Sequence, residues 1–252
     1  MVKVLMHGCN GRMGKVISEI LRTDENMEIV AGVDMFDDGS NNFPVFKEIT
    51  DCNVETDVII DFSNPQAIEG LLNYAESTKT PVVVCTTGLN DDQLSRIVEI
   101  SAVVPVLKSA NMSLGINTLV KLLKTATEVL AGAGFDIEIV EKHHNKKLDA
   151  PSGTALMLAD GINEVLDNEY EYNYDRSKER KAREHKEIGI SAVRGGSIVG
   201  EHEVLFAGID EVIEIKHTAY SRAVFANGAI QAAKYIAGKA PGLYDMGDVI
   251  EG

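Results

Sequence analysis

The chain has 252 residues, of which 44% are hydrophobic and 25% are charged, a composition typical of a soluble globular protein with one large core or two smaller ones. Acidic residues outnumber basic residues by 39 to 24 and give a net charge of −15, which opposes binding to nucleic acid. Three cysteines without CxxC spacing, no signal-peptide pattern and no apolar run near ~18 residues predict a cytoplasmic protein without disulfides, structural zinc or a membrane span.

Strand-like and helix-like segments alternate regularly over residues 1–112. We expect strands at 2–8, 27–34, 56–63, 81–88 and 105–110, with helices from the glycine loop to about 23, at 65–78 and at 91–100. Short continuous apolar runs such as Val82–Val84 are typical of strands that are buried on both faces. The alternation therefore predicts a parallel sheet with helices on both of its faces.

The pattern becomes predominantly β in the second half of the chain. An amphipathic helix is expected at 114–130, followed by a strand at 135–143, a helix at about 152–166 and a solvated, mixed-charge loop or helix face at 175–186. The segments 187–208 and 211–222 are expected to be antiparallel strands joined by glycine-bearing turns. A last apolar helix is expected at 223–238.

The first strand and the first helix are joined by HGCNGRMG, which has the spacing GxxGxxG at Gly8, Gly11 and Gly14. Glycine permits a tight turn and a close backbone approach to a pyrophosphate, and the N-terminus of the helix attracts its charge. The alternative is an ordinary tight turn, because a glycine loop alone is a weak signal.

Asp34 ends the second expected strand, twenty residues after Gly14. An acidic residue at this distance can hold a ribose hydroxyl, although it can also simply start a turn. Met35 is uncharged and the next basic residue is Lys47, so a 2′-phosphate would meet an acid with little compensation unless Arg12 reaches it. This favours NADH over NADPH.

Two further expected strands end in short polar residues, at Thr86-Thr87-Gly88 and at Ser109 to Ser113. The carboxyl ends of parallel strands open onto the same edge of a sheet, where ligands bind. These residues can hold a nicotinamide amide through hydrogen bonds, or they can act only as turn formers.

The segment EKHHNKKLDAPSGTA, residues 141–155, concentrates positive charge in this acidic chain. Pro151 suits the first turn of a helix that Ser152 or Thr154 caps, and a helix N-terminus beside lysines attracts carboxylates. Alternatively, the lysines are ordinary surface residues and the histidines are metal ligands or polar edge residues. Adjacent histidines point to opposite sides of a strand, which argues against a shared metal. A histidine beside an anion site can instead donate a proton.

These motifs together resemble one family. VEKHHNKKLDAPSGTAL, with GCNGRMG, TTG, SANMSLGIN, FANGAIQAAKYIAG and GLYDMGDVI, is similar to the 4-hydroxy-tetrahydrodipicolinate reductases, also called dihydrodipicolinate reductases, of lysine and diaminopimelate biosynthesis. The resemblance implies an α/β fold with a Rossmann-like parallel-sheet cofactor domain at 1–112 and 223–252. It further implies an α+β substrate-binding and tetramerisation domain with a mixed sheet at 113–222, and reduction of a cyclic dicarboxylate by NADH or NADPH in a homotetramer.

The resemblance also implies roles for individual residues. His143 and Lys147 correspond to a proton-donating catalytic pair, and His144, Gly153 and Thr154 to substrate contacts. The implied cofactor contacts are Gly8, Cys9, Asn10, Gly11, Arg12, Met13, Asp34, Cys85, Thr86, Thr87, Ser109, Ala110, Asn111 and Met112. The chain departs from the family pattern at Cys85, where glycine is common, at Met112, where an aromatic residue is common, and at Met35, where NADPH-using members often carry arginine.

Two other functions remain open on the sequence. A dehydrogenase of the same fold could use the HHNKK loop to bind a different small amino dicarboxylate. A dinucleotide-sensing regulator could retain the nucleotide fold without catalysis, but it would have no use for the histidine and lysine pair.

Overall fold

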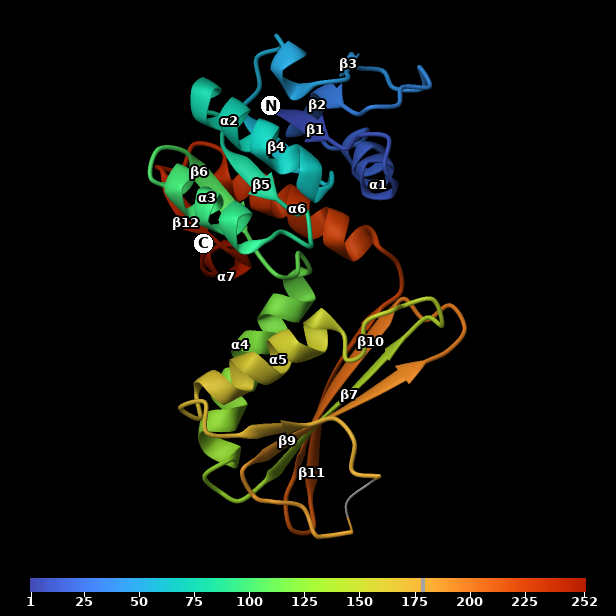
Figure 1. Cartoon of the computed structure of the whole chain (residues 1–252), viewed down its shortest axis with the longest axis vertical. Helices are drawn as coiled ribbons and strands as arrows, with labels where there is room; N and C mark the ends of the chain where they lie inside the picture. The colour runs from blue at the N-terminus through green and yellow to red at the C-terminus, as the bar shows by residue number, and fades with distance from the viewer. Residues whose placement is uncertain (178–179) are drawn as a thin grey trace. The chain divides into compact units, whose positions relative to one another are not determined.

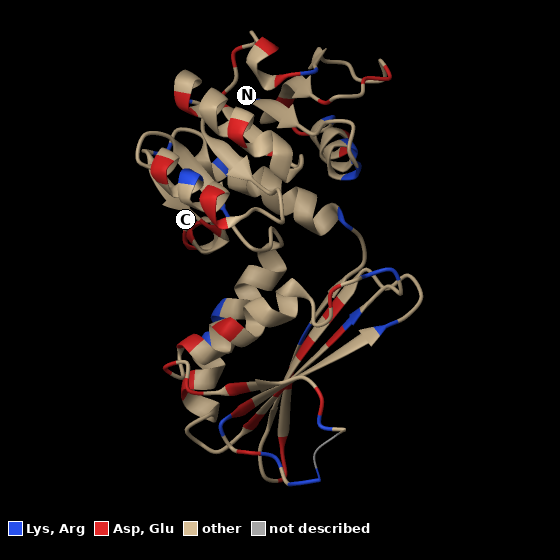
Figure 2. Cartoon of the chain, viewed as in Figure 1, with Lys and Arg blue, Asp and Glu red and all other residues tan. Residues whose placement is uncertain are grey.

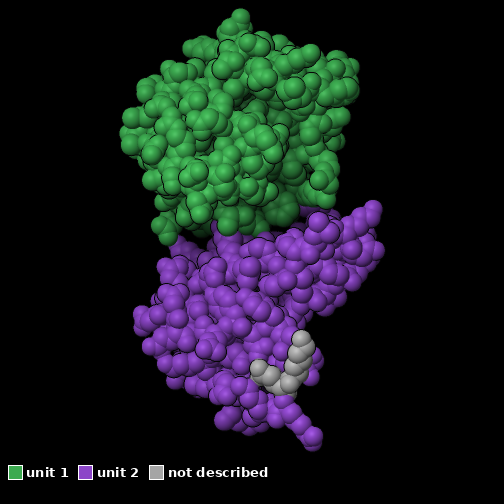
Figure 3. All heavy atoms as spheres, viewed as in Figure 1, with its two compact units in different colours: residues 1–114, 222–252 green, residues 115–221 purple. Residues whose placement is uncertain are grey.

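The computed structural model describes residues 1–177 and 180–252, and they form two compact units (Figure 1, Figure 3). Unit 1 consists of residues 1–114 and 222–252, and unit 2 consists of residues 115–221. Unit 2 is therefore inserted into the sequence of unit 1. None of the helices in the described residues is long and apolar enough to cross a membrane.

Unit 1 is built on a seven-stranded sheet with the order β12-β6-β5-β4-β1-β2-β3, in which every neighbouring pair is parallel. The strands are β1 (Val2–His7), β2 (Met27–Val33), β3 (Val45–Phe46), β4 (Val58–Asp61), β5 (Val82–Val84), β6 (Pro105–Lys108) and β12 (Gly242–Tyr244). The predicted parallel sheet and the Rossmann-like fold are thus confirmed. The short edge strands β3 and β12 were not predicted.

Helices cover both faces of this sheet, and a separate apolar core fills each side. On one face α1 (Arg12–Leu21) and α6 (Ala223–Ile236) pack over buried residues that include Met6 and Ile60. On the other face α2 (Ile68–Thr78) and α3 (Asp91–Ser101) pack over Leu5 and Ile59. Alternate residues of β1 and β4 therefore serve opposite cores, which explains why these strands read as continuous apolar runs. The remaining elements of the unit are the short helices at Ile49–Asp51 and Pro65–Ala67 and α7 (Met246–Glu251).

The strand order reverses between β1 and β4. From β1 the chain moves to β2 and β3 on one side, and then to β4, β5 and β6 on the other. In open α/β sheets, the crevice beyond the carboxyl ends of the strands at such a point is the usual ligand site. Here that crevice lies beyond His7 and Asp61.

Unit 2 contains a five-stranded sheet with the order β11-β10-β7-β9-β8. Its strands are β7 (Asp136–His143), β8 (Glu171–Asn173), β9 (Glu187–Arg194), β10 (Gly200–Ala207) and β11 (Val212–Ala219). The β7–β9 and β8–β9 pairs are parallel, and the β7–β10 and β10–β11 pairs are antiparallel, so the predicted mixed sheet is confirmed. The helices α4 (Leu114–Leu130) and α5 (Gly153–Glu164) share an apolar core with this sheet.

The strands of 187–208 and 211–222 run antiparallel, as predicted, and β10 pairs with β11. However, β9 and β10 do not pair with each other, because β7 lies between them. The turn after β9 is tied to the end of β7 instead, since Gly195 donates its N–H to the carbonyl of His143 and Asn145 donates its N–H to that of Gly196. As an interior strand, β7 pairs its backbone groups along both edges, with β9 and with β10.

The polar tract before β9 is a loop in the described part of 175–186, which is one of the two forms predicted for it; residues 178–179 lie outside the described residues. The short strand β8 precedes this loop and was not predicted. Arg183 fastens this tract to β7 through Asp136 at 2.7 Å and Glu138 at 3.0 Å. Figure 2 shows basic and acidic segments interleaved on this sheet, which is the pattern of local ion pairs.

Candidate active site

The loop between β1 and α1 is a tight turn in which two glycines leave no room for a side chain. Gly8 has a φ of +82°, and a Cβ on it would lie 2.6 Å from the carbonyl oxygen of Phe62. A Cβ on Gly14 would lie 2.3 Å from the carbonyl oxygen of Gly8. The helix α1 begins at Arg12 without a side-chain cap, so its first N–H groups can bind an anion. The geometry fits a phosphate cradle.

Asp34 follows β2 and holds the glycine loop. One carboxylate oxygen accepts the N–H of Asn10 at 3.0 Å, and the other accepts the N–H of Phe36 at 3.1 Å. The second bond makes Asp34 a turn former, as the alternative interpretation of the sequence expected, while the first places its carboxylate beside the predicted phosphate loop. Met35 is 73% exposed and offers no charge to a phosphate.

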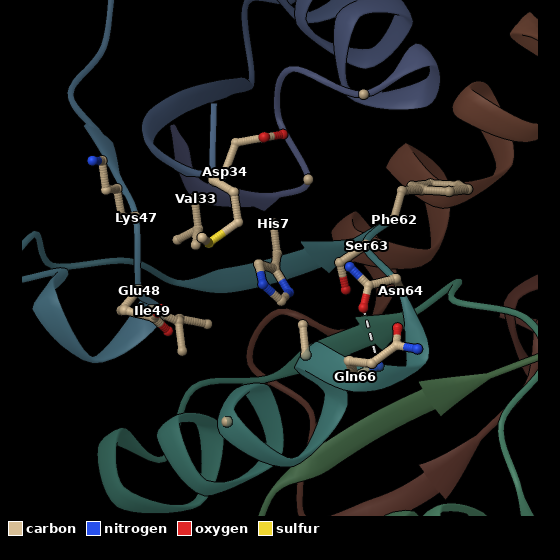
Figure 4. A pocket seen from close by; sticks show the side chains of 15 residues that line it. His7, Val33, Asp34, Lys47, Glu48, Ile49, Phe62, Ser63, Asn64 and Gln66 are labelled. Atoms are coloured by element: carbon tan, nitrogen blue, oxygen red, sulfur yellow. Dashed lines mark hydrogen bonds between the residues drawn. The ribbon is translucent and has the colours of Figure 1, made fainter. Parts of the chain in front are cut away.

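A cavity of about 400 Å³ opens at the carboxyl ends of β1 and β4 (Figure 4), within the size range of ligand pockets. Gly8, Gly11 and Asp34 line it, and so does Lys47 from the segment after β3. The other predicted cofactor residues are not part of this lining: Cys9, Asn10, Arg12, Met13, Cys85, Thr86, Thr87, Ser109, Ala110, Asn111 and Met112.

A buried pair at the base of this cavity was missed by the sequence analysis. His7 Nδ1 lies 2.9 Å from Asp61 Oδ1, and Ser63 donates both its hydroxyl, at 2.6 Å, and its N–H to the same oxygen. Burial opposes ionisation of Asp61, but the hydrogen bonds from His7, Ser63 and Thr86 prevail and lower its pKa. The network joins the ends of β1, β4 and β5. Polar residues that end neighbouring strands were the signal that could have identified it.

The two remaining predicted turns also lie at this edge of the sheet. Cys85 to Thr87 follows β5 and Ser109 to Met112 follows β6, and these strands are paired. Burial raises the pKa of the Cys85 thiol well above its ordinary value, so this cysteine is a neutral packing residue. Asn111 accepts the N–H of Ser113 at 2.8 Å, which shapes the second turn.

In unit 2, the predicted catalytic and substrate residues gather at the end of β7 and the start of α5. His143 is the last residue of β7 and is buried, whereas its neighbour His144 is only partly buried. Lys147 forms an ion pair with Asp149 at 2.9 Å. Ser152 caps α5 by accepting the N–H of Ala155.

Gly153 and Thr154 form the first turn of α5, directly after this cap. The structure thus brings the helix N-terminus and the basic loop together, as the local sequence predicts, and this arrangement suits a carboxylate ligand.

Three residues that the sequence analysis did not single out complete this cluster. The fully buried Glu141 is hydrogen bonded to His143 and Arg194, and His202 lies against the His143 ring with 5.1 Å between ring centroids. The sequence signal for Glu141 was the two-residue spacing from His143, which puts both on one face of a strand. Arg194 and His202 come from β9 and β10, and no local pattern links them to β7.

Burial lowers the pKa of His143; its partner Glu141 opposes this effect, and the charges of Lys147 and Arg194 reinforce it. A negative ligand at the helix N-terminus would raise that pKa again.

Among the residues that the structure describes, no cluster of histidine, cysteine or acidic side chains could hold a metal ion.

His202 makes the stability of the protein sensitive to mild acid. Burial, and then the neighbouring His143, lower its pKa from 6.5 to about 4. The unfolded chain therefore binds a proton between these values while the folded chain does not, and stability falls as the pH drops. From about pH 7.5 to about pH 5 we expect a loss of about 2 kcal/mol from this residue.

Urea unfolding of the wild type and of His202→Gln at both pH values measures this contribution. His143 and His217 also have lowered pKa values, so the wild type should lose more stability in total than His202 alone accounts for. The variant should lose about 2 kcal/mol less than the wild type. An equal loss in both proteins would show that His202 titrates normally.

Known proteins resemble the chain over nearly its whole length. The family models described as "Dihydrodipicolinate reductase, N-terminus" and "Dihydrodipicolinate reductase, C-terminus" match residues 2–112 and 115–250. Relatives named 4-hydroxy-tetrahydrodipicolinate reductase include those of Clostridium novyi (strain NT), 53% identical, and Caldanaerobacter subterraneus subsp. tengcongensis, 52% identical, each covering 100% of this chain and 99% of the relative. The solved structure of a dipicolinate-bound dihydrodipicolinate reductase from Paenisporosarcina sp. TG-14 has a TM-score of 0.81 and 26% identity over 97% of each chain.

Proposed function

Since the chain belongs to the dihydrodipicolinate reductase family, we propose that it reduces 4-hydroxy-tetrahydrodipicolinate to tetrahydrodipicolinate in lysine and diaminopimelate biosynthesis. The observation that carries this proposal is the cluster at the end of β7, where a buried histidine and a lysine lie close to the start of α5. The solved relative binds dipicolinate, a cyclic dicarboxylate, which supports the same class of ligand here.

The family and the Rossmann-like fold of unit 1 imply a reduced nicotinamide dinucleotide, which supplies the hydride when bound. The tight loop from Gly8 to Gly14 and the start of α1 suit its pyrophosphate, and Asp34 suits a ribose hydroxyl. The turns after β5 and β6 would hold the nicotinamide end.

In unit 2, each predicted residue has a role that its surroundings support. The N–H groups of Gly153 and Thr154 at the start of α5, with the Thr154 hydroxyl, bind a substrate carboxylate, and His144 adds a contact. His143 and Lys147 deliver the proton that the product gains as hydride enters. The positive charge of this cluster also withdraws electron density from the substrate ring, which makes it a better hydride acceptor.

The decisive test follows absorbance of the reduced cofactor after the purified protein meets substrate made freshly by the preceding synthase. Rapid oxidation supports the proposed reaction. If a folded protein that binds NADH oxidises neither NADH nor NADPH, the β7 cluster recognises another acid; a panel of amino dicarboxylates then identifies it.

We further predict that NADH is preferred over NADPH. A 2′-phosphate beside Asp34 would face this carboxylate and that of Glu48, with Lys47 as a cation in the same lining. The balance of charge is unfavourable, so kcat/KM should be higher with NADH. Steady-state kinetics with both cofactors test the preference, and a value ~10-fold higher for NADPH, equivalent to about 1.4 kcal/mol, would reverse it.

A homotetramer assembled through unit 2 is also part of the proposal. Apolar side chains remain exposed on its sheet, including Val193, Val212 and Ile213 at 44%, 54% and 38%, and such side chains are suited to burial between subunits. Light scattering should give about four times the chain mass of 27.3 kDa. A monomer at working concentration would contradict this assembly.

Three free, buried cysteines suit a cytoplasmic location.

A further inference from the structure

Glu141 is a fully buried carboxylate at a position where the strand pattern calls for an apolar side chain. The residues of β7 alternate between partly buried and buried, and Glu141 continues the buried row of Ile137 and Ile139 toward His143. Burying a charge is costly unless every lone pair is occupied. A glutamate at this place therefore requires a compensating set of donors.

That set of donors is complete. Arg194 binds the carboxylate through two hydrogen bonds, from Nη1 to Oε2 at 2.7 Å and from Nη2 to Oε1 at 2.6 Å. Oε1 also accepts the N–H of Ser152 at 2.9 Å, and Oε2 lies 2.6 Å from His143 Nδ1. The pKa of Glu141 is lowered because the bonds from Arg194, His143 and Ser152 outweigh the effect of burial. Glu141 is therefore ionised, and an ionised carboxylate only accepts hydrogen bonds.

This fixes the tautomer of His143. Its Nδ1 must carry a proton in order to bond to an ionised Glu141, so Nε2 is the nitrogen that gains and releases a proton. Nε2 has no hydrogen-bond partner among the residues that the structure describes. Gly200 leaves space for the ring, because a Cβ there would lie 3.1 Å from Nε2.

We propose that Glu141, held by Arg194, is a positioning residue that keeps the proton on His143 Nδ1 and so reserves Nε2 for proton delivery to the substrate. This inference rests on the proposed function. In the transfer step the Nε2–H bond breaks, its electron pair stays on the ring, and the proton joins the substrate. Glu141 takes no proton; it stabilises the charged ring beforehand and selects one neutral tautomer afterwards.

The same carboxylate also links the proton donor to the anion site. Glu141 binds the N–H of Ser152, the residue that caps α5, and Arg194 donates a further hydrogen bond to the carbonyl of Asp149 at 2.7 Å. Asp149 in turn pairs with Lys147. One buried ion pair thus sets the positions of His143, Lys147 and the start of the helix together.

Glu141→Gln is the informative variant because it nearly preserves shape while removing charge. Arg194 can only donate, so it should claim the amide oxygen of the glutamine and leave the NH₂ group facing His143 Nδ1. Nδ1 must then accept, and the proton moves to Nε2. A neutral imidazole with its proton on Nε2 is a very weak acid, so kcat/KM should fall by about 10²-fold, with the Kd for NADH unchanged.

The tautomer is read directly from ¹⁵N NMR of histidine-labelled protein, with His143→Asn used to assign the signal among the six histidines. We expect Nδ1–H in the wild type and Nε2–H in Glu141→Gln. Glu138→Gln is the matched control: it is a glutamate of the same strand that pairs with Arg183 at 3.0 Å, and it should leave both the tautomer and turnover unchanged.

The proposal is overturned if folded wild-type protein shows Nε2–H, a measurement that needs no variant, or if Glu141→Gln retains turnover within about twofold of wild type. Because the tautomer is measured without substrate, it remains decisive even if the protein proves inactive on 4-hydroxy-tetrahydrodipicolinate. Wild-type Nδ1–H that shifts in Glu141→Gln would then support the positioning role while the proposed reaction fails.

Discussion

Replacing His143 and Lys147 together with alanine is expected to reduce kcat by at least about 10³-fold, since removal of a general acid alone typically costs about 10²–10⁴-fold. Cofactor binding should persist, because the predicted cofactor residues lie in unit 1 and both substitutions lie in unit 2. Stopped-flow or steady-state turnover, combined with fluorescence titration of NADH, measures the two properties separately.

Lys146→Ala provides the matched control for this experiment. Lys146 is exposed and adjoins Lys147 in the same loop. Its replacement removes one lysine charge from the loop, as the replacement of Lys147 does, but leaves the proposed proton donors in place. We expect turnover to fall far less than in the double variant. The double variant could instead keep its stability, its NADH binding and its full effect in the cell. The protein would then be a dinucleotide-sensing regulator, and the proposed chemistry would be wrong.

The sequence was most informative where structure depends on neighbouring residues. The apolar runs of β1, β4 and β5 and the glycine turn into α1 predicted a parallel sheet, because each signal lies within a few residues. The basic cluster was predictable for the same reason, since one strand end and one helix start within residues 141–155 bring its members together.

Contacts between distant segments could not be predicted in this way. Nothing local indicates that β7 separates β9 from β10, and this arrangement is what places Arg194 beside Glu141, at 53 residues' separation. The pair of His7 and Asp61 similarly depends on β4 lying next to β1. Strand order decides these contacts, and strand order is a property of the whole sheet.

Gly228→Ala is expected to destabilise unit 1 by at least about 3 kcal/mol, although alanine normally favours a helix over glycine by about 0.5–1 kcal/mol. Gly228 lies in α6, where a Cβ would come within 1.6 Å of the carbonyl oxygen of Met112. That oxygen belongs to the backbone, so no side-chain rotation relieves the overlap. Either α6 or the turn from Ser109 to Met112 must move.

Gly70→Ala separates this effect from helix propensity. Gly70 lies in α2, and the nearest atom to its Cβ would be 4.0 Å away, so this variant should be unchanged or up to about 1 kcal/mol more stable. Urea unfolding of both variants measures the difference. Because the displaced turn carries predicted cofactor contacts, folded Gly228→Ala should also bind NADH more weakly. Equal stability of the two variants would mean that α6 does not approach Met112 so closely in solution.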